Sequence, residues 1–194
     1  LGLTLAFSAV TAGVSMALNL SPNVGLGFTL VGFVLLFVVN RMADSAKGLP
    51  AIFAFAGAMG AGLGPMLNHY MAMPGGPSLV MQSLGGTALI FFGLSAYALQ
   101  SKRDFSFMGG FLFAGLMIAI VAMLANFFLQ IPLLSVTISA VVVMIMSGLI
   151  LYDTSRIIHG GETNYIRATV GLYLNIYNLF VHLLSLLGVF GGDD

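Results

Sequence analysis

Apolar stretches long enough to cross a bilayer follow one another along almost the whole chain. A transmembrane helix needs about 20 mainly apolar residues, and the breaks between these stretches carry Pro, Gly, Asn or clustered charges, which lipid tolerates poorly. The sequence therefore predicts an all-α membrane protein, a seven-helix bundle that forms a single transmembrane domain over residues 1–194. The expected spans are residues 1–19, 24–40, 50–71, 78–99, 107–128, 133–157 and 165–189.

The composition supports a chain that is solvated by lipid. Charged residues make up 6% of the chain and apolar residues 59%, whereas soluble domains carry about 25% charged residues. The net charge is zero and no basic block is present, which argues against a nucleic-acid partner. The absence of Cys excludes disulfides and thiolate chemistry. We expect a multi-pass protein whose first partner is the lipid bilayer.

The Lys and Arg residues lie in or flank only alternate breaks between the spans, which predicts the orientation. By the positive-inside rule these breaks face the cytoplasm. With seven spans the N-terminus is then cytoplasmic, and the C-terminal tail with Asp193 and Asp194 is periplasmic. A re-entrant last segment would give six spans and return the tail to the cytoplasm, but its length favours a full crossing. The cations are Arg41, Lys47, Lys102, Arg103, Arg156 and Arg167.

The third span contains "GAMGAGLGP", in which Gly60 and Gly64 have GxxxG spacing. Small residues at this spacing let helix backbones approach closely in lipid, where the hydrophobic effect adds little between helices. A packing surface is the first interpretation of these glycines. A hinge or a dimer face is the alternative.

No catalytic motif is present in the chain. It has no GxSxG, no HExxH and no P-loop. The histidines His69, His159 and His182 are scattered over different segments and do not suggest a metal site. The sequence therefore predicts a protein that is not an enzyme, with no catalytic residues, no cofactor site and no metal site.

An acid stands inside the apolar stretch "LILYDTSRIIHGG". Asp153 lies six residues before His159, about 9 Å along a helix, so it lies near the cytoplasmic edge of the hydrocarbon. A carboxylate there should face the bundle interior and needs a partner. The last span carries a polar stripe at spacings of three, four and three, which an antiparallel neighbour could set against Asp153. The stripe is Asn175, Asn178, His182 and Ser185.

These polar residues allow two interpretations. In the structural one, Asn and Ser hydrogen-bond across helices, and Asp153 pairs with Arg156 three residues on. In the functional one, Asp153 and Asn175 form a proton-sensitive latch or a pore lining. Arg156, Asn178, His182 and Ser185 would then complete a polar seam.

The segment "LYDTSRII" followed by "LYLNIYNLFVHLLSLLG" resembles the C-terminal signature of the Bax inhibitor (TMBIM-type) family, in which YDxxxI precedes LYLDxxNLFxxLLxxxG. "HGGETNYIRATVGLY", "SAVTAG" and "LGGTALIFF" are similar to the bacterial YccA branch of that family. The resemblance implies a seven-helix bundle in the bacterial inner membrane, with six helices around the polar last one.

The resemblance also implies a function. The YccA branch associates with the FtsH protease and slows its degradation of membrane proteins such as SecY; ATP and zinc belong to FtsH. We therefore expect a regulatory protein that binds FtsH, alone or with the membrane regulators of FtsH. Other members are pH-sensitive calcium leaks, in which two aspartates share a proton and an arginine locks the closed state, and this is the alternative function.

The sensor positions of the family carry over onto Asp153, Asn175 and, as the locking arginine, Arg41. The family has an aspartate where this chain has Asn175. An amide does not titrate, so the repulsion that makes two carboxylates share a proton is absent. One carboxylate also offers few oxygen ligands to calcium. We expect at most a weak calcium site, and a latch rather than a gate.

Overall fold

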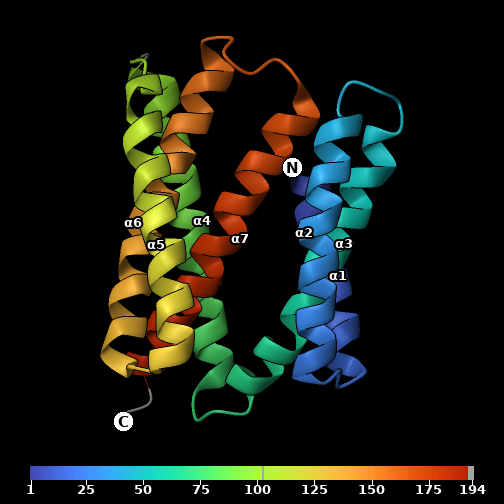
Figure 1. Cartoon of the computed structure of the whole chain (residues 1–194), viewed down its shortest axis with the longest axis vertical. Coiled ribbons are helices and arrows are strands. Elements are labelled where there is room, and N and C mark those ends of the chain that lie inside the picture. The colour runs from blue at the N-terminus through green and yellow to red at the C-terminus, as the bar shows by residue number, and fades with distance from the viewer. Residues whose placement is uncertain (102, 192–194) are drawn as a thin grey trace. The chain divides into compact units, whose positions relative to one another are not determined.

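The computed structural model of the chain describes residues 1–101 and 103–191, and it is helical (Figure 1). Lys102 and the tail residues Asp193 and Asp194 lie outside the described residues. The predicted all-α fold with seven helices is confirmed for the described part of the chain. The elements are α1 (Gly2–Ala17), α2 (Pro22–Met42), α3 (Gly48–Met71), α4 (Gly76–Ser101), the 3-10 turn η1 (Ser106–Met108), α5 (Gly109–Leu129), α6 (Pro132–Ile158) and α7 (Tyr165–Phe190).

Six of these helices are long and apolar enough to cross a membrane, α5 being counted together with η1. Helix α1 is the short one. Its 16 residues give a length of about 24 Å, below the ~30 Å of a hydrocarbon core. Apolar residues flank it at Leu1 and Leu18 and extend its hydrophobic length.

The helices begin and end where the sequence places its turn-forming residues. Pro22 and Pro132 occupy the first positions of α2 and α6. A backbone N–H at this position has no acceptor within the helix, so proline costs no hydrogen bond there. Gln130 ends α5 in the left-handed conformation, with φ 53°. The side chain of Asn126 stabilises this turn, because its Oδ1 accepts from the N–H of Ile131 at 3.0 Å and its Nδ2 donates to Oγ of Ser135 at 2.6 Å.

The chain forms two compact units. Unit 1 comprises Leu1–Pro74 and Thr163–Tyr173, and unit 2 comprises Gly75–Glu162 and Leu174–Asp194. Two of the three crossings between the units fall in loops, and the third falls inside α7, which is helical on both sides of it. A single transmembrane domain therefore stays the prediction for the chain.

Unit 1 is organised around α3, along which both α1 and α2 pack (Figure 1). A methyl group on Gly60 would collide with the carbonyl oxygen of Ser8 on α1, and one on Gly64 would collide with the side chain of Ser15. Towards α2, a Cβ on Gly25 would lie 2.7 Å from the ring of Pro65. Glycine thus lets α3 approach both neighbours, which supports the packing interpretation of Gly60 and Gly64.

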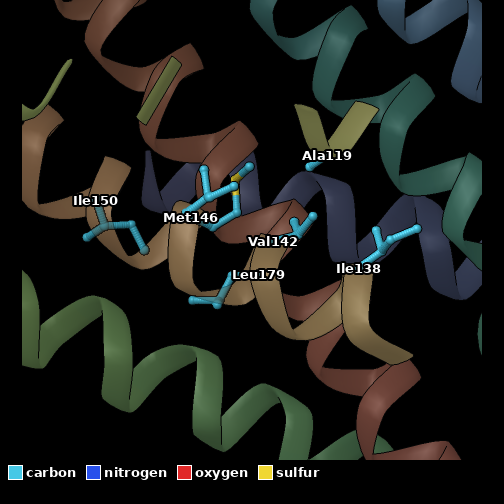
Figure 2. Close-up of a cluster of buried hydrophobic side chains, with 7 residues drawn as sticks. Ala119, Ile138, Val142, Met146, Ile150 and Leu179 are labelled. Carbon is cyan, nitrogen blue, oxygen red and sulfur yellow. The ribbon is translucent and has the colours of Figure 1, made fainter. Parts of the chain in front are cut away.

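Unit 2 has α6 at its centre, with α4 and α5 packed along it. One face of α6 presents side chains at four-residue intervals. Ile145 of α6, Ala119 of α5 and Leu179 of α7 complete the same cluster, most of which is labelled in Figure 2. Each member is less than a tenth exposed. Regular spacing along α6 therefore builds the core of this unit. The α6 members at four-residue intervals are Ile138, Val142, Met146 and Ile150.

Substitution of Gly60 by Val should destabilise unit 1, because the added side chain collides with α1. Overpacking of this kind costs about 1–3 kcal/mol. The matched control is Gly13→Val on α1, since a Cβ there meets no atom within 4 Å. An SDS titration in mixed micelles measures the free energy of unfolding. Equal losses for the two variants would contradict the packing role.

Candidate functional site

Asp153 and Asn175 meet inside unit 2. Asp153 is half-buried on α6, five residues before the end of the helix, and Asn175 is buried on α7. Nδ2 of Asn175 donates a hydrogen bond to Oδ2 of Asp153 at 2.7 Å. The structure therefore brings together two of the three residues that the sequence suggested for a latch. The role as a latch stays a prediction.

The chemistry of this pair differs from that of two carboxylates. An amide can donate to an ionised carboxylate, and after exchange of its oxygen and nitrogen positions it can accept from a protonated one. The contact can thus persist in both protonation states of Asp153. Two facing carboxylates could not both ionise at this distance without strong repulsion. Asn175 makes the contact a stable joint between α6 and α7 rather than a shared-proton site.

Arg156 has other partners than the one considered from the sequence. Its Nη2 donates to the carbonyl oxygen of Gly161 at 3.0 Å and lies 3.9 Å from Oε2 of Glu162. Its guanidinium carbon lies 5.5 Å from the centre of the Tyr152 ring. Among the described residues its ion pair is therefore with Glu162 and not with Asp153. This pair is half-buried and long, so it contributes little stability by itself, but it shapes the turn after α6.

The rest of the polar stripe on α7 splits into separate contacts. Nδ1 of His182 lies 3.2 Å from Oγ of Ser139 on α6. Nδ2 of Asn178 donates to the carbonyl oxygen of Leu174, one turn back in its own helix, at 2.8 Å. Ser185 is half-buried at the far end of the stripe. Together with the Asp153–Asn175 bond, the His182–Ser139 contact joins α6 and α7 at two positions, as the structural interpretation expects.

Arg41 lies in the last turn of α2, in unit 1, and its side chain is exposed. Asp153 and Asn175 belong to unit 2. The proposed action of Arg41 on this pair stays a prediction.

Comparison with known proteins identifies the family. The family described as "Inhibitor of apoptosis-promoting Bax1" matches residues 1–192. The chain is 53% identical over 194 residues to the "Modulator of FtsH protease YccA" of Escherichia coli K12, covering all of this chain and 88% of that protein. It is 51% identical to an uncharacterized membrane protein of Vibrio cholerae, covering all of this chain and 87% of that protein. The chain belongs to the Bax inhibitor family.

The membrane location follows from the same findings. A relative from Escherichia coli O6:H1, also 53% identical over 194 residues, is named an inner membrane protein. Six helices among the described residues have the length and hydropathy of membrane spans. This Bax inhibitor family member is therefore a multi-pass protein of the bacterial inner membrane.

Ser155 is a polar residue of this family member whose role the sequence did not reveal. It is fully buried, two residues after Asp153. Its Oγ accepts from the N–H of Phe105 at 2.9 Å and donates to the carbonyl oxygen of Arg103 at 3.4 Å. The hydroxyl thus fixes the α4–α5 loop to α6. Nearby in this loop, hydrogen bonds from Ser106 lower the pKa of Asp104.

A second polar joint lies in unit 1, at the start of α7. Oδ1 of Asn164 accepts from the N–H groups of Ile166 and Arg167, and so caps the helix. Its Nδ2 donates to the carbonyl oxygen of Ala43 at 2.9 Å and to Oδ1 of Asp44 at 2.8 Å. Arg167 forms an ion pair with the same Asp44. The segment "ETNYIR", which carried part of the resemblance, thus holds the α2–α3 loop to α7.

Substitution of Asn175 by Leu should destabilise the protein, because Asp153 loses a hydrogen-bond donor in a mostly buried setting. A loss of this kind costs about 1–3 kcal/mol. Asn178→Leu is the matched control on the same helix, since Asn178 donates to its own helix, and we expect a loss below about 1 kcal/mol. SDS titration of both variants measures the difference. If Asn178→Leu loses as much free energy of unfolding as Asn175→Leu, the hydrogen bond between α6 and α7 contributes no more than a bond within one helix.

Proposed function

We propose that this protein is a regulatory protein of the inner membrane. It associates with FtsH and slows the degradation of membrane proteins by FtsH. The observation that carries the proposal is the 53% identity, over the whole chain, to a protein named as a modulator of FtsH. Because the identity extends over all seven helices, we expect this protein and its relative to present a similar surface in the membrane and to bind the same partner.

The polar side chains of the structure are consistent with a role that does not require catalysis. Asp153 bonds to Asn175, Ser155 fixes the α4–α5 loop, and His182 meets Ser139. Each of these contacts connects helices or loops. A modulator acts through its surface, and these joints give that surface a defined shape.

The contact with FtsH would be made laterally in the membrane or through the loops. By the positive-inside rule the α2–α3, α4–α5 and α6–α7 loops would face the cytoplasm, because the described cations lie in them or in the adjoining helix turns. This orientation, with a cytoplasmic N-terminus and a periplasmic C-terminus, is part of the proposal.

Affinity purification of the tagged full chain from native inner membranes tests the association. We expect FtsH to be recovered under mild detergent extraction, with or without its membrane regulators. In a strain that lacks the chain, SecY left without its translocon partners should be degraded faster than in the parent strain. The Asn178→Leu variant should fold, and it should still recover FtsH and slow the degradation of SecY. Recovery without FtsH, together with unchanged SecY turnover, would overturn the proposal.

A calcium or proton leak is the weaker candidate, since Asp153 faces an amide and not a second acid. We expect calcium flux into proteoliposomes to be small and equal at pH 6 and pH 8. Asn175→Asp should make the flux pH-dependent, because two carboxylates at this position cannot both ionise freely. Strong pH dependence in the unmodified protein, lost in Asp153→Asn, would favour the leak instead.

A further inference from the structure

An apolar groove runs along unit 1 between α1 and α2, with α3 as its floor. Its volume is about 520 Å³. Small residues of α3, among them Ala54, Gly57 and Ala61, form the floor, and Phe28 and Leu35 of α2 form part of one wall. The groove exists because α1 and α2 both approach α3 closely at glycines and leave the space between them unfilled.

The lining of the groove suits a hydrocarbon chain. Two hydroxyls reach it, but Thr11 donates to the carbonyl oxygen of Ser8 at 3.0 Å and Ser15 donates to that of Ala61 at 2.8 Å. Both hydroxyl protons are therefore already donated to backbone carbonyl oxygens of unit 1. An apolar cavity of ~150 Å³ holds the six carbons of benzene, so this groove has room for about twenty carbons. That is the size of one acyl chain. A helix with side chains is about 10–12 Å across and is the larger, less suitable occupant.

Two cations lie beyond the end of the groove where α2 finishes and α3 begins. Lys47 precedes Ala54 on the floor by seven residues, about two helical turns, so it is in register with the floor and about 10 Å from it along α3. Arg41 follows Leu35 by six residues on α2, about 9 Å along that helix and about 120° around it, so its long side chain must extend along the helix end to reach the groove. Both side chains are exposed.

The α2–α3 loop therefore carries positive charge that its own acid does not neutralise. Asp44 is paired with Arg167. Within the described ranges 1–101 and 103–191, no carboxylate lies within 4 Å of the charged nitrogens of Lys47 or Arg41. Long cationic side chains at the end of an apolar surface reach the headgroup layer and bind anionic headgroups there.

We propose that unit 1 binds an anionic phospholipid, with one acyl chain in the groove between α1 and α2 and the headgroup phosphate at Lys47 and Arg41. The groove supplies the volume and the apolar lining, and the loop supplies the complementary charge. The bound chain fills the space beside α1, whose 16 residues make it the shortest of the seven α-helices in the described part of the chain. This proposal does not depend on FtsH binding.

The chain contains no Trp, so one introduced Trp gives an unambiguous fluorescent reporter. Phe28→Trp places the reporter in the wall of the groove, and Phe92→Trp places it on α4 of unit 2, where Phe92 is 67% exposed. Each full-length variant is reconstituted in phosphatidylcholine vesicles that contain acyl-brominated phosphatidylglycerol or acyl-brominated phosphatidylcholine. Comparison of the two quenchers within one variant removes the effect of depth.

We expect the Trp at position 28 to show about a 25-fold preference for the anionic quencher, since each of the two cations near the surface contributes about a factor of five. The Trp at position 92 should be quenched equally by both lipids. In the Phe28→Trp background, Lys47→Gln and Arg41→Gln should each lower the preference about fivefold. Arg103→Gln, which removes an exposed cation from a loop of unit 2, should leave it unchanged.

Equal quenching by the two lipids at position 28 would overturn the proposal. A preference that survives the combined loss of Lys47 and Arg41 would overturn it as well. Ala54→Leu fills the floor of the groove without altering any charge, and it should reduce quenching of the Trp at position 28 by both lipids. If Phe28→Trp fails to fold, Phe7→Trp on the opposite wall provides the same measurement.

Discussion

The close approach of α1 and α2 to α3 is the interaction on which unit 1 depends. In lipid, apolar side chains gain little by leaving the solvent, so the distance between backbones decides how strongly helices associate. Glycines at positions 25, 60 and 64 remove the side chains that would keep these helices apart. The same close contacts create the groove and bring Ser8 within hydrogen-bond distance of Tyr173, at 2.7 Å, which joins α7 to this unit.

Unit 2 uses polar side chains for a similar purpose. The α6 helix bonds to α7 through Asp153 and Ser139 and to the α4–α5 loop through Ser155. Each of these groups would be costly in hydrocarbon without a partner, and each partner lies on another element. The polar content of the sequence, small as it is, therefore specifies which helices meet and in which register.

The sequence predicted the parts of the structure that depend on one helix at a time. Span length and hydropathy gave the seven helices, and residue spacing placed Asp153 opposite the stripe that contains Asn175. Contacts that need the folded loops were not predictable. The ion pair of Arg156 with Glu162 was not predictable, because the two side chains come together only through the folded turn after α6. The groove also left no signal in the sequence, because its floor and walls come from three helices whose spacing is a tertiary property.

The shortness of α1 has a consequence for the membrane itself. Its regular part is about 6 Å shorter than a typical hydrocarbon core. Lipids beside it must compress, or polar groups must move inward to meet its ends, at a fraction of a kcal/mol per Å. With the flanking Leu1 and Leu18 counted, the apolar length is about 27 Å, so we expect the bilayer next to α1 to be thinner by about 3 Å. A neighbouring membrane protein with a short hydrophobic segment would find its best-matched surroundings at that position.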